Sequence, residues 1–128
     1  MSVEFQISKK PNYVLLSCQG TVSNEALLNV YETALTIAVG EDLKAAVIDI
    51  RELEGATPTT TSRYYLGVAV AQLHLDTRPG VFMAVVGKPP ILDPSKFGET
   101  VATNRGACVK VFTDFDEAIT WIEENIIK

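Results

Sequence analysis

Five hydroxyl-bearing residues occur within the eight residues ATPTTTSR, at positions 56 to 63. A hydroxyl beside a helix start can cap the helix, contact an anion or accept a phosphoryl group. Pro58 biases Thr57 toward an extended conformation, so a helix is expected to begin just after it. Thr59 or Thr60 is then the predicted N-cap residue, which would stabilise the helix by about 1 kcal/mol.

Capping uses only one of these hydroxyls and leaves the others available for further chemistry. Together with Arg63, they surround the positive end of the predicted helix, where a phosphate or sulfate would be stabilised. We rank capping first, anion or ligand binding second, and phosphorylation third. The candidates for anion binding or phosphorylation are Thr59, Thr60, Thr61, Ser62 and Arg63.

The remaining sequence shows no catalytic pattern. His74 is the only histidine, and at the end of a predicted helix it fits neutralisation of the negative helix terminus better than base catalysis. There is no Gly-x-Ser-x-Gly elbow, no phosphate-binding loop and no dinucleotide fingerprint. The sequence therefore predicts no enzyme activity, no catalytic residue, no metal site and no cofactor.

Acidic residues cluster near the end of one predicted strand. Asp49, Glu52 and Glu54 lie there, and open α/β sheets often place ligand crevices at such strand ends. Arg51 lies among them, so the favoured interpretation is an ion pair with an acidic neighbour rather than acid-base catalysis.

Composition limits the classes of partner. The 128 residues form one predicted domain, residues 1–128, with a net charge of −5 and a pI near 4.8. This charge disfavours nucleic acids and anionic membrane surfaces, and no apolar run reaches the ~18 residues of a membrane span. The N-terminal MSVEFQISKK lacks the features of a signal peptide, so we expect a cytoplasmic protein.

Cys18 and Cys108 lack metal-ligand spacing and are expected to be small buried residues.

Hydrophobic periodicity predicts the order β-β-α-β-α-β-α-β-α. The expected strands are residues 3–8, 13–20, 45–50, 81–87 and 108–112. The first expected helix runs from an N-cap at Ser23 to Gly40, and the second runs from the hydroxyl-rich segment to about His74. The third has Asp93 as its N-cap, followed by Pro94, and ends at Gly106; the fourth has Thr113 as its N-cap. Because strands separated by helices pair in parallel, the expected fold is α/β, with a five-stranded mixed sheet, an N-terminal antiparallel hairpin and four helices.

Two segments support a family resemblance. The strand end IDIRELEG and the closing NRGACVKVFTDFDEAITWI, in this order of elements, resemble STAS-like domains related to bacterial anti-sigma-factor antagonists, in an uncharacterised branch. The resemblance implies a non-enzymatic module that binds a regulatory protein around the start of its second helix. In the best-known members that start carries an Asp-Ser pair whose serine is phosphorylated, and the pair is absent from residues 57–62 here.

One face of the second helix is a candidate interface. Tyr64, Gly67, Ala71 and His74 follow at helical spacing and are expected to form an outer face that another chain could approach closely, in a homodimer or a regulatory complex. Small residues on a surface helix also need no partner. The alternative function is binding of a small anionic or apolar ligand, in a crevice between the end of strand 45–50 and the start of this helix.

Overall fold

The computed structural model describes residues 3–55, 58–77, 81–89, 91–92, 96–105 and 107–126. The elements follow the predicted order: β1 (Val3–Lys9), β2 (Val14–Thr21), α1 (Asn24–Gly40), β3 (Ala45–Glu54), α2 (Thr60–Thr77), β4 (Phe82–Val86), α3 (Phe97–Asn104), β5 (Val109–Phe112) and α4 (Phe115–Ile126). None of the helices in these ranges is both long and apolar enough to cross a bilayer.

The five strands form one mixed sheet in the order β1-β2-β3-β4-β5. β1 pairs with β2 in antiparallel register, and each of the other neighbouring pairs is parallel. The hairpin turn is closed by the Lys10 amide, which donates to the Tyr13 carbonyl at 2.8 Å. The predicted α/β fold class and strand directions are confirmed.

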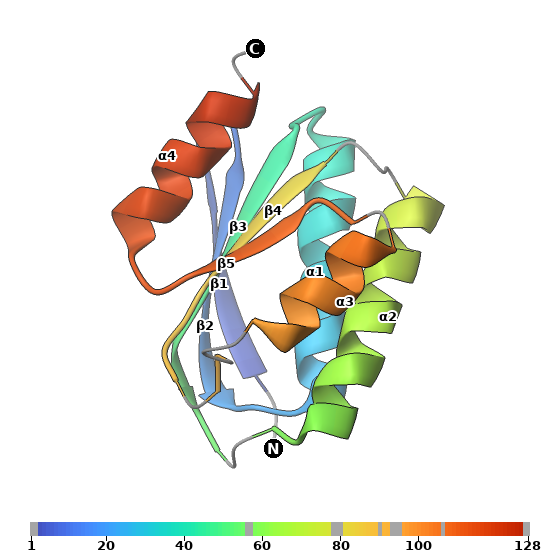
Figure 1. Ribbon diagram of the computed structural model, residues 1–128. Coiled ribbons are helices and arrows are strands. Elements are labelled where there is room, and N and C mark those ends of the chain that lie inside the picture. Colours follow the sequence, from blue (N-terminus) through green and yellow to red (C-terminus); the bar gives the residue numbers. More distant parts are fainter. Residues whose placement is uncertain are drawn as a thin grey trace.

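Helices cover both faces of the sheet, with α1, α2 and α3 on one side and α4 on the other (Figure 1). β3 shows why its sequence is almost continuously apolar. Ala46 and Ile48 join the core under α1, whereas Ala45 and Val47 join the core under α4. Because both faces of this strand are buried, alternation between apolar and polar residues is lost.

α2 is the outermost helix of the three-helix side. It packs mainly across α1 and α3 rather than directly on the sheet (Figure 1). Val70 and Ala71 are buried in these contacts, whereas Tyr64, Tyr65 and Leu75 remain exposed. A helix held between two others leaves only a narrow strip for solvent or a partner.

The ends of two helices follow the prediction. α1 has Ser23 as its N-cap, whose Oγ accepts a hydrogen bond from the Ala26 amide at 3.1 Å, and it ends at Gly40. α2 runs to Thr77, one turn beyond the expected end near His74.

The other two helix starts differ from the prediction or cannot be compared with it. The Oδ1 of Asp114 accepts hydrogen bonds from the amides of Asp116 and Glu117 at 2.8 and 3.3 Å, so Asp114, not Thr113, caps α4. Asp114 directly precedes Phe115, the first residue of α4, and is therefore the residue in the N-cap position. The α3 signals expected at Asp93, Pro94 and Gly106 lie outside the described residues.

Candidate functional site

The start of α2 is fixed by hydrogen bonds on two sides. The Oγ1 of Thr59 accepts a hydrogen bond from the Ser62 amide at 3.0 Å, which confirms Thr59 as the N-cap. From the start of α1, the Asn24 side-chain amide donates to the Ser62 carbonyl at 2.8 Å. Thr60 and Thr61 are exposed. Their role in anion binding or phosphorylation stays a prediction.

Two tyrosines form an aromatic surface in the first turns of α2. Tyr64 is 40% exposed and Tyr65 is 64% exposed, and their rings meet edge to face with centroids 5.7 Å apart. Arg105, just after α3, donates from Nη2 to the Tyr64 hydroxyl at 3.1 Å, and its guanidinium lies 5.7 Å from the Tyr64 ring centroid. We call Tyr64, Tyr65 and Arg105 the tyrosine patch.

The outer face predicted from helical spacing is wrong for three of its four residues. Gly67, Ala71 and His74 are buried, and only Tyr64 is exposed. The physical reason is that α1 and α3 flank α2 on both sides, so the small side chains allow helices of the same chain to pack closely. Sequence reasoning also missed Tyr65, because it lies outside the chosen spacing although it is an exposed aromatic residue.

His74 does not act as a cation at the end of α2. Its side chain is fully buried, and burial lowers its pKa from 6.5 to about 4. Neither ring nitrogen has a hydrogen-bond partner among the described residues. The imidazole is therefore neutral at physiological pH, and the predicted neutralisation of the helix terminus is wrong.

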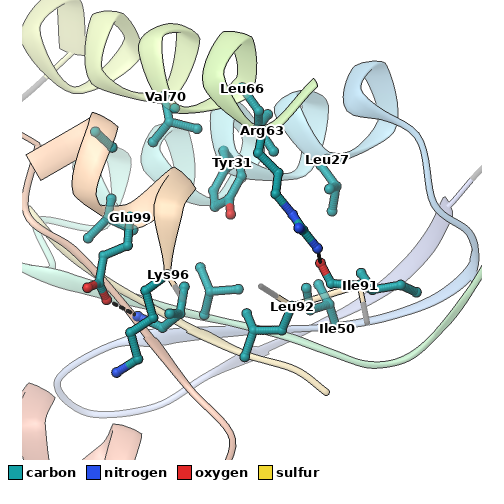
Figure 2. A pocket seen from close by; sticks show the side chains of 15 residues that line it. Leu27, Tyr31, Ile50, Arg63, Leu66, Val70, Ile91, Leu92, Lys96 and Glu99 are labelled. Carbon is teal, nitrogen blue, oxygen red and sulfur yellow. Dashed lines mark hydrogen bonds between the residues drawn. The ribbon is translucent and has the colours of Figure 1, made fainter. Parts of the chain in front are cut away.

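A cavity of about 80 Å³ lies between the sheet and the three helices α1, α2 and α3. Its walls are mostly aliphatic, and residues that represent each side are Leu27, Ile50, Leu66, Val70, Leu92 and Val109. Ile50 comes from β3, and Arg63 comes from the first turn of α2 (Figure 2). The cavity thus lies at the crevice expected from the sequence, and ligand binding there stays a prediction.

Polar groups enter this cavity at only a few points. The hydroxyl of Tyr31 points into it from α1, and Arg63 extends across it to the Ile91 carbonyl, which accepts from Nη2 at 3.5 Å (Figure 2). Glu99 lies on the α3 side, where its Oε1 accepts a hydrogen bond from the Val111 amide at 2.7 Å. Lys96 also lines the cavity.

In the acidic cluster at the end of β3, Asp49 forms the ion pair with Arg51 that the sequence predicted. Arg51 forms a two-point ion pair with Asp49, at 2.9 Å from Nε to Oδ1 and 2.8 Å from Nη2 to Oδ2. Burial opposes ionisation of Asp49, but the hydrogen bonds and charge of Arg51 outweigh it and hold the pKa of the carboxyl below its usual value. Within the described ranges, no three His, Cys, Asp or Glu side chains are grouped as metal ligands.

The two cysteines differ in burial. Cys18 is buried as expected, and burial, aided by the charge of Asp49, raises the pKa of its thiol to about 12. Cys108 is only half-buried, because it immediately precedes the short edge strand β5. The thiol of Cys18 is therefore unreactive at physiological pH.

The chain is similar along its length to solved structures of one fold. An anti-sigma factor antagonist from Mycobacterium paratuberculosis shares 15% identity with a TM-score of 0.63, covering 95% of each chain. The anti-sigma factor antagonist SpoIIAA in its unphosphorylated form shares 12% identity with a TM-score of 0.57, covering 94% of this chain and 97% of the other.

A third similar structure is an uncharacterised protein of the DUF3478 family from Shewanella loihica, described as having a SpoIIAA-like fold. It shares 19% identity with a TM-score of 0.53, covering 94% of this chain and 93% of the other. Comparison with protein-family models and with curated proteins found no match. The chain therefore has the SpoIIAA-like STAS fold that is found in anti-sigma-factor antagonists.

Proposed function

We propose that this protein is a non-enzymatic regulatory module that binds a protein partner through the tyrosine patch. The observation that carries the proposal is the exposure of Tyr64 and Tyr65 side by side at the start of α2. Two of the similar structures are named as antagonists of an anti-sigma factor, that is, of another protein. The proposed site of action is the cytoplasm, as expected from the sequence.

The patch has the physical properties of an interface centre. Tyrosine offers a large contact area and a hydroxyl, and it loses little side-chain entropy when it is immobilised. Here the edge-to-face contact and the hydrogen bond from Arg105 already restrict Tyr64. Part of the ordering cost of binding is therefore met before a partner arrives.

The hydroxyls beside the patch supply a means of regulation. Thr60 and Thr61 are exposed in the same first turn of α2, so an anion bound there, or a phosphoryl group on either residue, would place negative charge at the rim of the patch. Binding of an anion ranks before phosphorylation, because residues 57–62 lack the Asp-Ser pair that is phosphorylated in the best-known STAS-like domains. A regulatory protein is the proposed partner, and a second copy of this chain is the alternative.

Co-purification with matched variants tests the proposal. Tagged wild-type protein, Tyr65→Glu and Leu75→Glu would be expressed in the native cells, and bound proteins would be identified by mass spectrometry. Leu75 is the control because it is 52% exposed near the other end of α2. We expect Tyr65→Glu to lose a partner that wild type and Leu75→Glu retain. A partner retained equally by all three would refute the assignment of the patch.

Light scattering on the purified proteins separates the two kinds of partner. If a second copy binds at the patch, wild type runs as a dimer, Leu75→Glu stays a dimer and Tyr65→Glu becomes a monomer. If the partner is a regulatory protein, all three run as monomers while the co-purification difference persists.

A further inference from the structure

We propose that the outer edge of β1 pairs with the same edge of a second copy of this chain, in an antiparallel register centred on Ile7. The sheets of the two copies would then form one continuous sheet. This surface shares no residue with the tyrosine patch, and the inference does not depend on the proposed regulatory partner.

β1 is an edge strand whose outer side is open. It pairs with β2 on one side, and within the described part of the chain no strand lies on the other side. The second half of the strand, from Gln6 to Lys9, is exposed. An edge of this kind presents backbone N–H and C=O groups that another strand can satisfy.

The hairpin geometry shows which of these groups point outward. The Lys10 amide donates to the Tyr13 carbonyl at 2.8 Å, so Lys10 directs its N–H toward β2. In an antiparallel pair, this direction alternates from residue to residue. Phe5, Ile7 and Lys9 therefore direct their N–H and C=O groups away from β2, where a partner strand can reach them.

The side chains of the strand are self-complementary in one register. When Ile7 lies opposite Ile7 of the second copy, Phe5 lies opposite Lys9 of the second copy, and all of these residues direct their backbone groups toward each other. The same register places Glu4 opposite Lys10 of the second copy, and two-fold symmetry makes this pair occur twice. Among the described residues, neither Glu4 nor Lys10 has an ion-pair partner within its own chain. Opposite charges that face each other across two strands stabilise the pairing.

Other registers lack this complementarity. A shift of one residue would set outward-directed groups against inward-directed ones, and it would place opposed side chains on different faces. A shift of two residues, centred on Gln6, would set Glu4 opposite Ser8 and bring no opposite charges together within residues 3–10. The register centred on Ile7 also covers an exposed apolar side chain, since Ile7 is 47% exposed.

Charge reversal across the predicted pair tests the register. Sedimentation equilibrium of the purified wild-type chain should show monomers and dimers in exchange. Glu4→Lys and Lys10→Glu should each weaken dimerisation about tenfold, because each variant sets like charges opposite each other twice. An equimolar mixture of these two variants should dimerise again, since opposite charges then meet at both positions. The control Glu124→Lys makes the same change of charge in α4 and should dimerise like wild type.

Disulfide formation gives an independent measurement of the register. Directly opposed residues of antiparallel strands have Cα atoms close enough for a disulfide bond. Under mild oxidation, Ile7→Cys should therefore form a covalent dimer that wild type, with its own two cysteines, does not form. Gln6→Cys is the matched control one residue away, and it should crosslink more slowly.

Three results would overturn the proposal: a monomeric wild type at high concentration, a mixture of the charge variants that stays monomeric, or crosslinking of Gln6→Cys as fast as that of Ile7→Cys. The proposed function is tested separately, because Tyr65→Glu should keep the β1 dimer. The light-scattering comparison of the patch variants is accordingly made in the Glu4→Lys background, in which pairing of β1 is suppressed. Loss of the dimer in Tyr65→Glu alone would assign dimerisation to the tyrosine patch and refute the role of β1.

Discussion

The buried His74 should make the stability of this protein depend on pH over a defined range. Its pKa lies near 4 in the folded protein and near 6.5 when the ring is exposed. The unfolded chain therefore takes up a proton at a higher pH than the folded chain does. Stability is fully present above pH 6.5 and is lost as the pH falls toward 4, because the folded pKa is the lower one.

The size of this effect follows from the two pKa values. The difference between 6.5 and about 4 corresponds to about 3 kcal/mol in total, of which about 2 kcal/mol is lost between pH 7 and pH 5. Ordinary carboxyl groups titrate mainly below this range. As His74 is the only histidine of the chain, no other histidine contributes to the change.

Urea unfolding at pH 7 and pH 5 measures the prediction. Wild type should lose about 2 kcal/mol between the two conditions, whereas His74→Gln and His74→Leu should lose much less. His74→Leu should also be more stable than His74→Gln at pH 7, by about 1 kcal/mol, because no described residue satisfies a polar group at this buried position.

The single histidine also allows an independent measurement of its pKa. The ring proton resonance of folded wild-type protein should stay at its neutral position down to pH 5. A titration midpoint near 6.5, or the same loss of stability in wild type and both variants, would refute the burial argument.

Three further substitutions test local features, each by urea unfolding at pH 7. Gly55→Ala should destabilise by about 1–3 kcal/mol, because φ is 135° and the new Cβ would lie 2.9 Å from Val22 Cγ1; an unchanged stability would contradict this backbone assignment. Thr59→Ala should cost about 1 kcal/mol through loss of the N-cap, whereas Thr61→Ala should cost little, and equal effects would be inconsistent with the capping geometry. Gly40→Ala should stabilise by about 0.5–1 kcal/mol, since its Cβ would meet nothing within 4 Å; a loss of stability would show that α1 does not end as described.

The strands were predictable from two local patterns: β1 alternates apolar and polar residues, and the central strands are short, largely apolar runs. β3 shows this most clearly, since burial on both faces removes alternation from Ala45 to Ile50. The N-cap of α2 was also predictable, because the effect of Pro58 on the preceding residue and the capping preference of Thr59 are both local. Local rules failed at α4, where Asp114 and Thr113 are neighbouring residues that can both cap.

The exposed face of α2 was not predictable from spacing. A single apolar stripe suggests that a helix covers one surface, but α2 contacts both α1 and α3. Gly67 and His74 are buried by this arrangement, although both are compatible with a surface. The cavity could be located only approximately for the same reason, since Tyr31 and Arg63 reach the same space from different helices.

Site-directed photo-crosslinking tests the proposed interface most directly. A photoreactive phenylalanine analogue would replace Tyr65 in one protein and Leu75 in another, and both would be irradiated in the native cells. The proposed interface predicts a discrete crosslinked adduct with one protein at position 65 and little or none at position 75. The absence of an adduct at position 65, or equal adducts at both positions, would contradict it.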